Sequence, residues 1–97
     1  MNELARETLV AAALNGVRQV KGMFRDHGGG RCAVGVLMES CAVPFNGFLN
    51  GDLTALCERY QTSVQELAQI VDANDNKGWD FLTIARKFGN EHEGQEA

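Results

Sequence analysis

The segment DANDNKGWDF, residues 72–81, places oxygen-bearing side chains at alternate positions, which is the ligand spacing of a calcium-binding loop. On that frame the first, third, fifth and ninth places are filled by Asp72, Asn74, Asn76 and Asp80. The sixth place requires glycine for a sharp turn but holds Lys77, and the twelfth requires a bidentate glutamate but holds Thr83. We therefore expect no metal site here, and a degenerate calcium loop at 72–83 is kept only as a further alternative.

A turn that ends in a helix cap explains more of the same residues. Asn74, Asp75 and Asn76 are turn formers, because their short polar side chains bond to the nearby backbone. Asp80 precedes a helix expected to begin at Phe81, where its carboxylate can accept from a free backbone amide. Such a cap typically contributes ~1 kcal/mol. The segment is therefore interpreted as the start of the last helix.

A thiol nucleophile is the second chemistry that the residue types allow. Cys32 stands where a helix is expected to begin, and a helix N-terminus lowers the pKa of a thiol. His27 lies upstream, and Asn74 or Asp75 could orient its ring. Against this, the three glycines at 28–30 leave His27 unpositioned, and the apolar helix that follows favours a buried thiol. We interpret Cys32 as a core residue.

The remaining catalytic and metal-binding motifs are incomplete. HGGG at 27–30 resembles the oxyanion loop of some esterases, but the chain has no Gly-x-Ser-x-Gly motif and no Gly-Lys-Ser/Thr phosphate loop. Three cysteines at wide spacing, with no Cys-x-x-Cys pair, predict reduced thiols rather than zinc ligands or a disulfide framework. We therefore predict a protein that is not an enzyme and that carries no cofactor.

The charge of the chain is unevenly distributed. The net charge is −4, yet residues 1–31 hold five basic side chains and only three acidic ones. An acidic body repels a phosphate backbone, and SVQELAQIVDAND, the second half of a segment with helix-turn-helix cadence, has no basic residue. We therefore expect no binding to nucleic acid. A segment that we call the basic arm, residues 18–31, could instead hold a small anionic ligand or nucleotide. Its candidate ligand-binding residues are Arg18, Lys21, Arg25 and Arg31.

Hydrophobic periodicity predicts a mainly α fold of about five short helices in a single compact domain, residues 1–89, followed by a frayed polar tail at 90–97. Asn2 is expected to cap a helix from Glu3 to Leu14. The segment at 32–42 is apolar nearly all round, which is typical of a central helix. Gly35 within it disfavours the helix by ~1 kcal/mol relative to alanine, and we therefore expect another backbone to pack close to it. The predicted core includes Leu14, Val34, Val36, Leu37, Leu56, Leu67, Val71, Phe81, Ile84 and Phe88.

Between these helices the pattern changes. In the basic arm, apolar and polar residues alternate, which predicts a small β-hairpin or an extended arm. The loop VPFNGFLNG carries two Asn-Gly turn signals and three large apolar side chains. If these side chains do not fold back onto the core, they form a small exposed patch. The candidate partner-binding residues are Phe45, Phe48 and Leu49.

Three segments resemble a group of small uncharacterised proteins of bacteriophage and actinobacterial genomes. NGVRQVKGMFRD is similar to a Ser-Gly helix ending followed by Gln-x-Lys/Arg-Gly-x-Leu-Arg. RCAVGVLMES is similar to Tyr-Cys-Cys-Leu-Gly-Val-Leu, and NDNKGWDFLTIARKF to Asn-Asp-x-x-Gly-x-Ser-Phe-x-x-Ile-Ala. The chain departs from the pattern at Ala33, Asp80 and Arg86, which replace a cysteine, a serine and an acid. The resemblance implies this element order and a phage or mobile-element origin, and it implies no activity.

These observations favour a non-enzymatic accessory protein that acts by protein–protein binding, through an unknown partner or self-association. The alternative is a small anionic-ligand or nucleotide-binding module that uses the basic arm. No apolar run approaches the ~20 residues that span a bilayer, and the acidic start MNELARETLV does not resemble a signal peptide. We therefore expect a cytoplasmic protein with no membrane contact.

Overall fold

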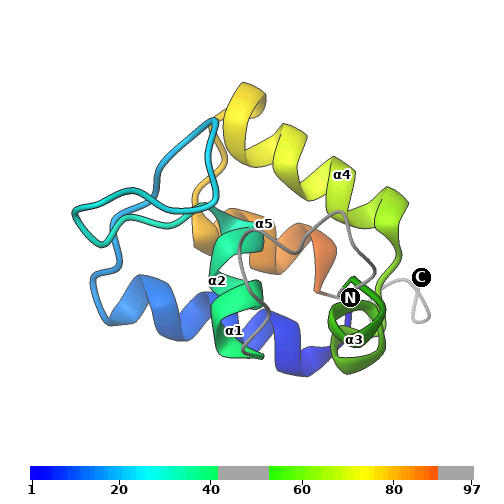
Figure 1. Cartoon of the computed structure of the whole chain (residues 1–97). Coiled ribbons are helices and arrows are strands. Elements are labelled where there is room, and N and C mark those ends of the chain that lie inside the picture. Colours follow the sequence, from blue (N-terminus) through cyan, green and yellow to red (C-terminus); the bar gives the residue numbers. More distant parts are fainter. Residues whose placement is uncertain (42–52, 90–97) are drawn as a thin grey trace.

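Five α-helices and one π-helical turn form the described part of the chain, residues 1–41 and 53–89 of a computed structural model (Figure 1). Within these ranges the backbone makes isolated β-bridges but no sheet, so the predicted mainly α fold of about five short helices is confirmed. No helix of the described residues is long and apolar enough to cross a membrane. The elements are α1 Glu3–Leu14, α2 Ala33–Ser40, α3 Leu53–Tyr60, α4 Val64–Asp72, the π-helical turn η2 Ala73–Lys77 and α5 Phe81–Phe88.

Helix α1 begins as predicted but buries a different face. The side chain of Asn2 accepts a hydrogen bond from the Ala5 amide and caps the helix. The sequence favoured a buried face through Leu4, Thr8, Ala11 and Leu14, and that assignment is wrong. Leu14 is 78% exposed, and the buried residues are Ala5, Leu9 and Ala12. Most residues of α1 are apolar, so the sequence pattern allows more than one face of the helix to be buried. The small alanines on the face that is buried allow neighbouring elements to approach closely.

Helix α2 is the centre of the molecule. Figure 1 shows it between α1 and α4, and it contacts both. Every residue from Ala33 to Met38 is buried, which confirms the predicted central helix. A Cβ atom on Gly35 would overlap the carbonyl oxygen of Phe24, so glycine lets the backbone of the arm pack directly on α2. The expected close approach of another backbone is therefore confirmed.

The basic arm leaves the helices at one end, as Figure 1 shows, and it makes isolated β-bridges but no regular β-hairpin. Arg31 makes isolated bridges to Gln19 and to Arg25. The Val20 amide donates to the Arg31 carbonyl at 3.0 Å, and the Cys32 amide donates to the Phe24 carbonyl at 3.1 Å. Few hydrogen bonds join the two passes of the chain, which is too few for a regular ladder but enough to fix the path of the arm.

Side-chain caps begin both helices of the second half of the fold. Asp80 accepts from the Thr83 amide at 2.8 Å to begin α5, as predicted, and of the two capping-box options at Thr62 and Ser63 it is Ser63 that accepts from the Glu66 amide to begin α4. The helical pattern of α4 predicts burial of Val64 as well as Leu67, and this is wrong for Val64, which is 58% exposed. Val71 and Phe88, both predicted core residues, are half-buried against the core. The other seven predicted core residues are buried: Val34, Val36, Leu37, Leu56, Leu67, Phe81 and Ile84.

Candidate anion-binding site

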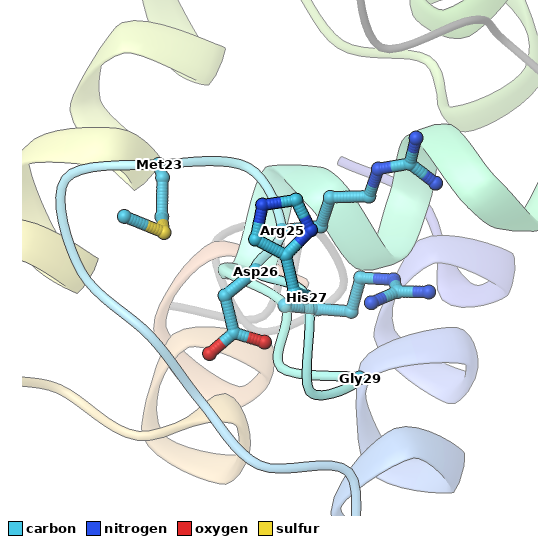
Figure 2. Close-up of a pocket in the computed structure, with 6 residues that line it drawn as sticks. Met23, Arg25, Asp26, His27 and Gly29 are labelled. Carbon is cyan, nitrogen blue, oxygen red and sulfur yellow. The ribbon is translucent and has the colours of Figure 1, made fainter.

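A hollow of about 660 Å³ lies on the basic arm. Its volume falls in the range of ~300–1,000 Å³ that is usual for small-molecule sites. Figure 2 shows Met23 to the left of the His27 ring and the Asp26 carboxylate below it. The lining residues are Met23, Arg25, Asp26, His27, Gly29 and Arg31.

Asp26 holds the tip of the arm together. Its Oδ1 accepts from the amides of Gly28 at 3.0 Å and Gly30 at 2.7 Å, and its Oδ2 pairs with Arg18 at 2.7 Å. The hydrogen bond from Arg18, followed by that from Gly30, holds the pKa of Asp26 below its ordinary value. No pattern in the sequence indicates this contact, because three consecutive glycines at 28–30 do not specify a conformation for the turn. The carboxylate of Asp26 therefore shapes the floor of the hollow.

Arg31 is fixed in place by neighbours on both sides. Its Nε and Nη2 donate to the Glu39 carboxylate at 3.2 and 2.8 Å, and its Nη1 donates to the Gly30 carbonyl at 2.9 Å. The side chain is only 16% exposed. This pairing raises the pKa of Arg31 and lowers that of Glu39. Arg31 therefore forms a rigid cationic wall, with part of its hydrogen-bonding capacity already used inside the protein.

The four predicted ligand-binding residues have different surroundings. Arg25 and Arg31 both line the hollow, and Arg25 is exposed. Arg18 lies behind the hollow as the partner of Asp26. Lys21 does not line it, and its Nζ lies near Gly78, outside the arm. His27, considered in the sequence only as a base for Cys32, also lines the hollow, and the sequence did not assign it to ligand binding.

Asn74 anchors the base of the arm, a role that the sequence did not reveal. Its side chain is fully buried in η2. Its Nδ2 donates to the Val20 carbonyl at 2.8 Å, and its Oδ1 accepts from Gln19 Nε2 at 2.7 Å and the Ala33 amide at 3.1 Å. Gln19 Nε2 also donates to the Trp79 carbonyl at 2.8 Å. The side-chain amide of Asn74 in the π-helical turn is therefore bonded both to the arm and to the start of α2.

The residues of the calcium-loop alternative use their oxygens elsewhere. Asn74 Oδ1 already accepts two hydrogen bonds, and Asp80 Oδ1 caps α5. Asp72 Oδ1 accepts from Asn76 Nδ2 at 2.7 Å. Across residues 1–41 and 53–89, no cluster of three or more His, Cys, Asp or Glu side chains could hold a metal ion. The geometry therefore gives no support to a cation site at 72–83.

Cys32 is a core residue, as predicted. The thiol caps α2 by accepting from the Gly35 amide, and the residue is 3% exposed. Burial raises the pKa of the thiol, and this outweighs the opposite influence of the backbone amides at the helix start. A buried, protonated thiol is a poor nucleophile. The site geometry therefore does not favour thiol catalysis.

The predicted partner-binding residues Phe45, Phe48 and Leu49 lie outside the described residues, as does the polar tail at 90–97. Searches against protein-family models, curated proteins and solved structures find no match to this chain. The assignment of a function therefore depends on the hollow and its chemistry.

Proposed function

We propose that the protein is a non-enzymatic binding module that holds the anionic group of a small ligand in the hollow of the basic arm. The observation that supports this most directly is the convergence of Arg25, His27 and Arg31 on one hollow whose walls are fixed by hydrogen bonds. Guanidinium groups bind carboxylates and phosphates through charge-assisted hydrogen bonds of defined geometry. The ligand group is therefore a carboxylate or a phosphate.

The charge around the hollow favours a small anion over a polyanion. Arg18 is paired with Asp26, and Arg31 is paired with Glu39. When Arg25 is added, three arginines stand against these two acids, which is an excess of one positive charge. The positive charge of Arg25 also lowers the pKa of Glu39, so Arg25 lies close enough to influence the Arg31–Glu39 pair. The local excess of positive charge is small, and the whole chain carries −4. A long phosphate backbone would meet net repulsion outside the hollow.

Protein–protein binding through Phe45, Phe48 and Leu49 stays a prediction, because those residues lie outside the described part of the chain. The phage or mobile-element origin likewise depends on the motif resemblance alone. An accessory protein of this kind is compatible with the anion-binding proposal, since a bound ligand can accompany a partner interaction elsewhere on the surface.

The test is a titration of the ¹⁵N-labelled protein with inorganic phosphate and with acetate, followed by amide chemical shifts. Binding in the hollow should move the amides of residues 25–31 in a saturable way. Arg25→Gln should weaken binding by about tenfold, because it removes an exposed charge-assisted donor worth roughly 1.5 kcal/mol. Arg86→Gln is the matched control, since it removes the same charge from an exposed position on α5.

Equal binding by wild type and Arg25→Gln would contradict the proposal. So would saturable shifts confined to residues outside the arm. A panel of nucleotides extends the test to larger ligands that carry a phosphate, with the melting temperature of the protein as the readout. A nucleotide that raises the melting temperature of the wild type but not that of Arg25→Gln identifies the ligand class.

A further inference from the structure

A second, smaller hollow of about 160 Å³ is lined in part by the basic arm. Met23 lines both hollows, so this side chain borders each of them. The smaller hollow extends from the arm to α4 and to the start of α2. Its lining residues are Gly22, Met23, Phe24, Cys32, Val71 and Asp75.

We propose that the ligand is an amphipathic anion whose short apolar tail occupies the smaller hollow while its charged head lies beside Arg25, His27 and Arg31. This inference rests on the proposed function and specifies its ligand class. The smaller hollow, of about 160 Å³, is small enough that we expect a short straight hydrocarbon chain, such as the five carbons beyond the carboxyl carbon of hexanoate, to fill it.

The lining of the smaller hollow favours an apolar occupant. Phe24 and Val71 are half-buried against the core, and they contribute aromatic and aliphatic surface. Cys32 is a protonated, buried thiol, which packs as a small apolar group. Met23 is 51% exposed, and its flexible thioether can adjust to the shape of a passing chain. A short hydrocarbon tail therefore gains burial here.

Asp75 sets the orientation of the ligand. Its carboxylate is the one acidic group of the smaller hollow and accepts from Asn74 Nδ2 at 2.8 Å. A second anion placed beside it would be repelled. The larger hollow also has one carboxylate, that of Asp26, but Asp26 is paired with Arg18 and two arginines, Arg25 and Arg31, line the same hollow. The head of the ligand therefore faces Arg25, and the tail passes Met23.

Hydrogen bonds hold the backbone on both sides of Met23, so the two hollows keep a fixed position relative to each other. On the C-terminal side, the Phe24 carbonyl accepts from the Cys32 amide and lies against Gly35 of α2. On the N-terminal side, the Val20 carbonyl is held by Asn74. The backbone around Met23 is thus anchored while its side chain is exposed, which suits a residue that contacts both parts of one ligand.

The test is a chain-length series of acetate, butyrate, hexanoate and octanoate, with dissociation constants measured by NMR titration. Affinity should rise by up to about fourfold per methylene as far as hexanoate and then level off, because the smaller hollow is full. Val71→Phe should bring the ratio of hexanoate to acetate affinity close to one by filling that hollow. Val64→Phe is the matched control, since Val64 lies on the same helix but is exposed, and it should keep the full ratio.

Met23→Ser is the second variant, because Val71 is half-buried and a phenylalanine there can disturb the fold. Serine at this exposed position removes the shared apolar wall and should lower the hexanoate-to-acetate ratio at least threefold. A ratio near one in the wild type, with acetate binding still dependent on Arg25, would overturn this inference and leave the proposed function standing. Failure of every anion to bind in the hollow would overturn both.

Discussion

Two polar segments of this chain, the turn at 72–80 and the basic arm at 18–31, have opposite relations to the rest of the protein. The turn carries the residue pattern of a metal loop, yet its side chains bond to the protein itself: Asn74 to the arm, Asp72 to Asn76, and Asp80 to the start of α5. The arm has no complete ligand-binding motif, yet Arg25 and Arg31 line a hollow there. The difference teaches that a ligand pattern in the sequence predicts a site only where its side chains are not already bonded within the protein.

The two segments are also one structural unit. Asn74 of the turn holds Val20 and, through Gln19, the base of the arm. The buried amide of the turn therefore stabilises the segment that we propose to bind ligand. The turn supports the arm, and the arm carries the proposed binding surface. Variants in the turn should therefore change stability, whereas variants in the arm should change anion binding.

Asn74→Ala should have the largest effect on stability. The substitution removes the partners of the Val20 carbonyl and the Ala33 amide, and each buried group left without a partner costs roughly 1–3 kcal/mol. We expect the free energy of unfolding, measured by urea denaturation, to fall by about 3 kcal/mol. Asn76→Ala is the control, since Asn76 is exposed and bonds only to Asp72, and it should cost under about 0.5 kcal/mol. Equal losses for the two variants would remove the distinction between anchor and turn.

Gly35→Ala should have the next largest effect, although alanine favours a helix by ~1 kcal/mol over glycine. The added methyl group would overlap the Phe24 carbonyl, so either the arm or α2 must move. Overpacking of this kind costs ~1–3 kcal/mol, and we expect a net loss of about 2 kcal/mol in urea denaturation. Ser40→Ala, at an exposed position of the same helix, should be neutral or slightly stabilising. A stabilised Gly35→Ala protein would show that the arm does not rest on α2.

Features that depend on neighbours in sequence could be predicted. The caps at Asn2, Ser63 and Asp80 need only a side-chain oxygen and an amide two or three residues later. The central position of α2 follows from its uninterrupted apolar character, and the role of Gly35 from the lack of any other reason for glycine there. In each case the physical cause is local, so the chain alone carries it.

Features that depend on distant partners could not be predicted. Asn74 bonds to groups 54 and 41 positions away, so its sequence context shows only a turn former. The buried face of α1 depends on which elements pack against it, and the apolar residues around Leu14 fit more than one arrangement. Likewise, the pairing of Arg31 with Glu39 is invisible in the sequence, and that pairing separates a structural arginine from an exposed one.

Asp80→Ala tests the predicted helix cap, which occupies the ninth position of the metal-loop pattern. Losing the hydrogen bond to the Thr83 amide should cost about 1 kcal/mol in urea denaturation at pH 7. The Thr83 hydrogen bonds hold the pKa of Asp80 below its ordinary value of 3.8. A carboxylate with a lowered pKa stabilises the fold above that ordinary value, and this contribution is lost as pH falls through the folded pKa. The difference between wild type and Asp80→Ala should therefore shrink below about pH 4. Asp80→Asn keeps the capping oxygen and should stay within about 0.5 kcal/mol of wild type at pH 7.

Arg25→Gln should have the smallest effect on stability and therefore gives the sharpest contrast with Asn74. Arg25 is exposed, and exposed charges contribute little to folding, so we expect the free energy of unfolding to change by under about 0.5 kcal/mol. Arg31→Gln, which breaks the pairing of a mostly buried guanidinium with the exposed carboxylate of Glu39, should cost about 1 kcal/mol in the same urea denaturation experiment. If Arg25→Gln destabilised the protein as much as Arg31→Gln, the arm would be a structural element like the turn. A stable Arg25→Gln protein that loses anion binding would instead separate the surface that contacts the ligand from the residues that hold it in place.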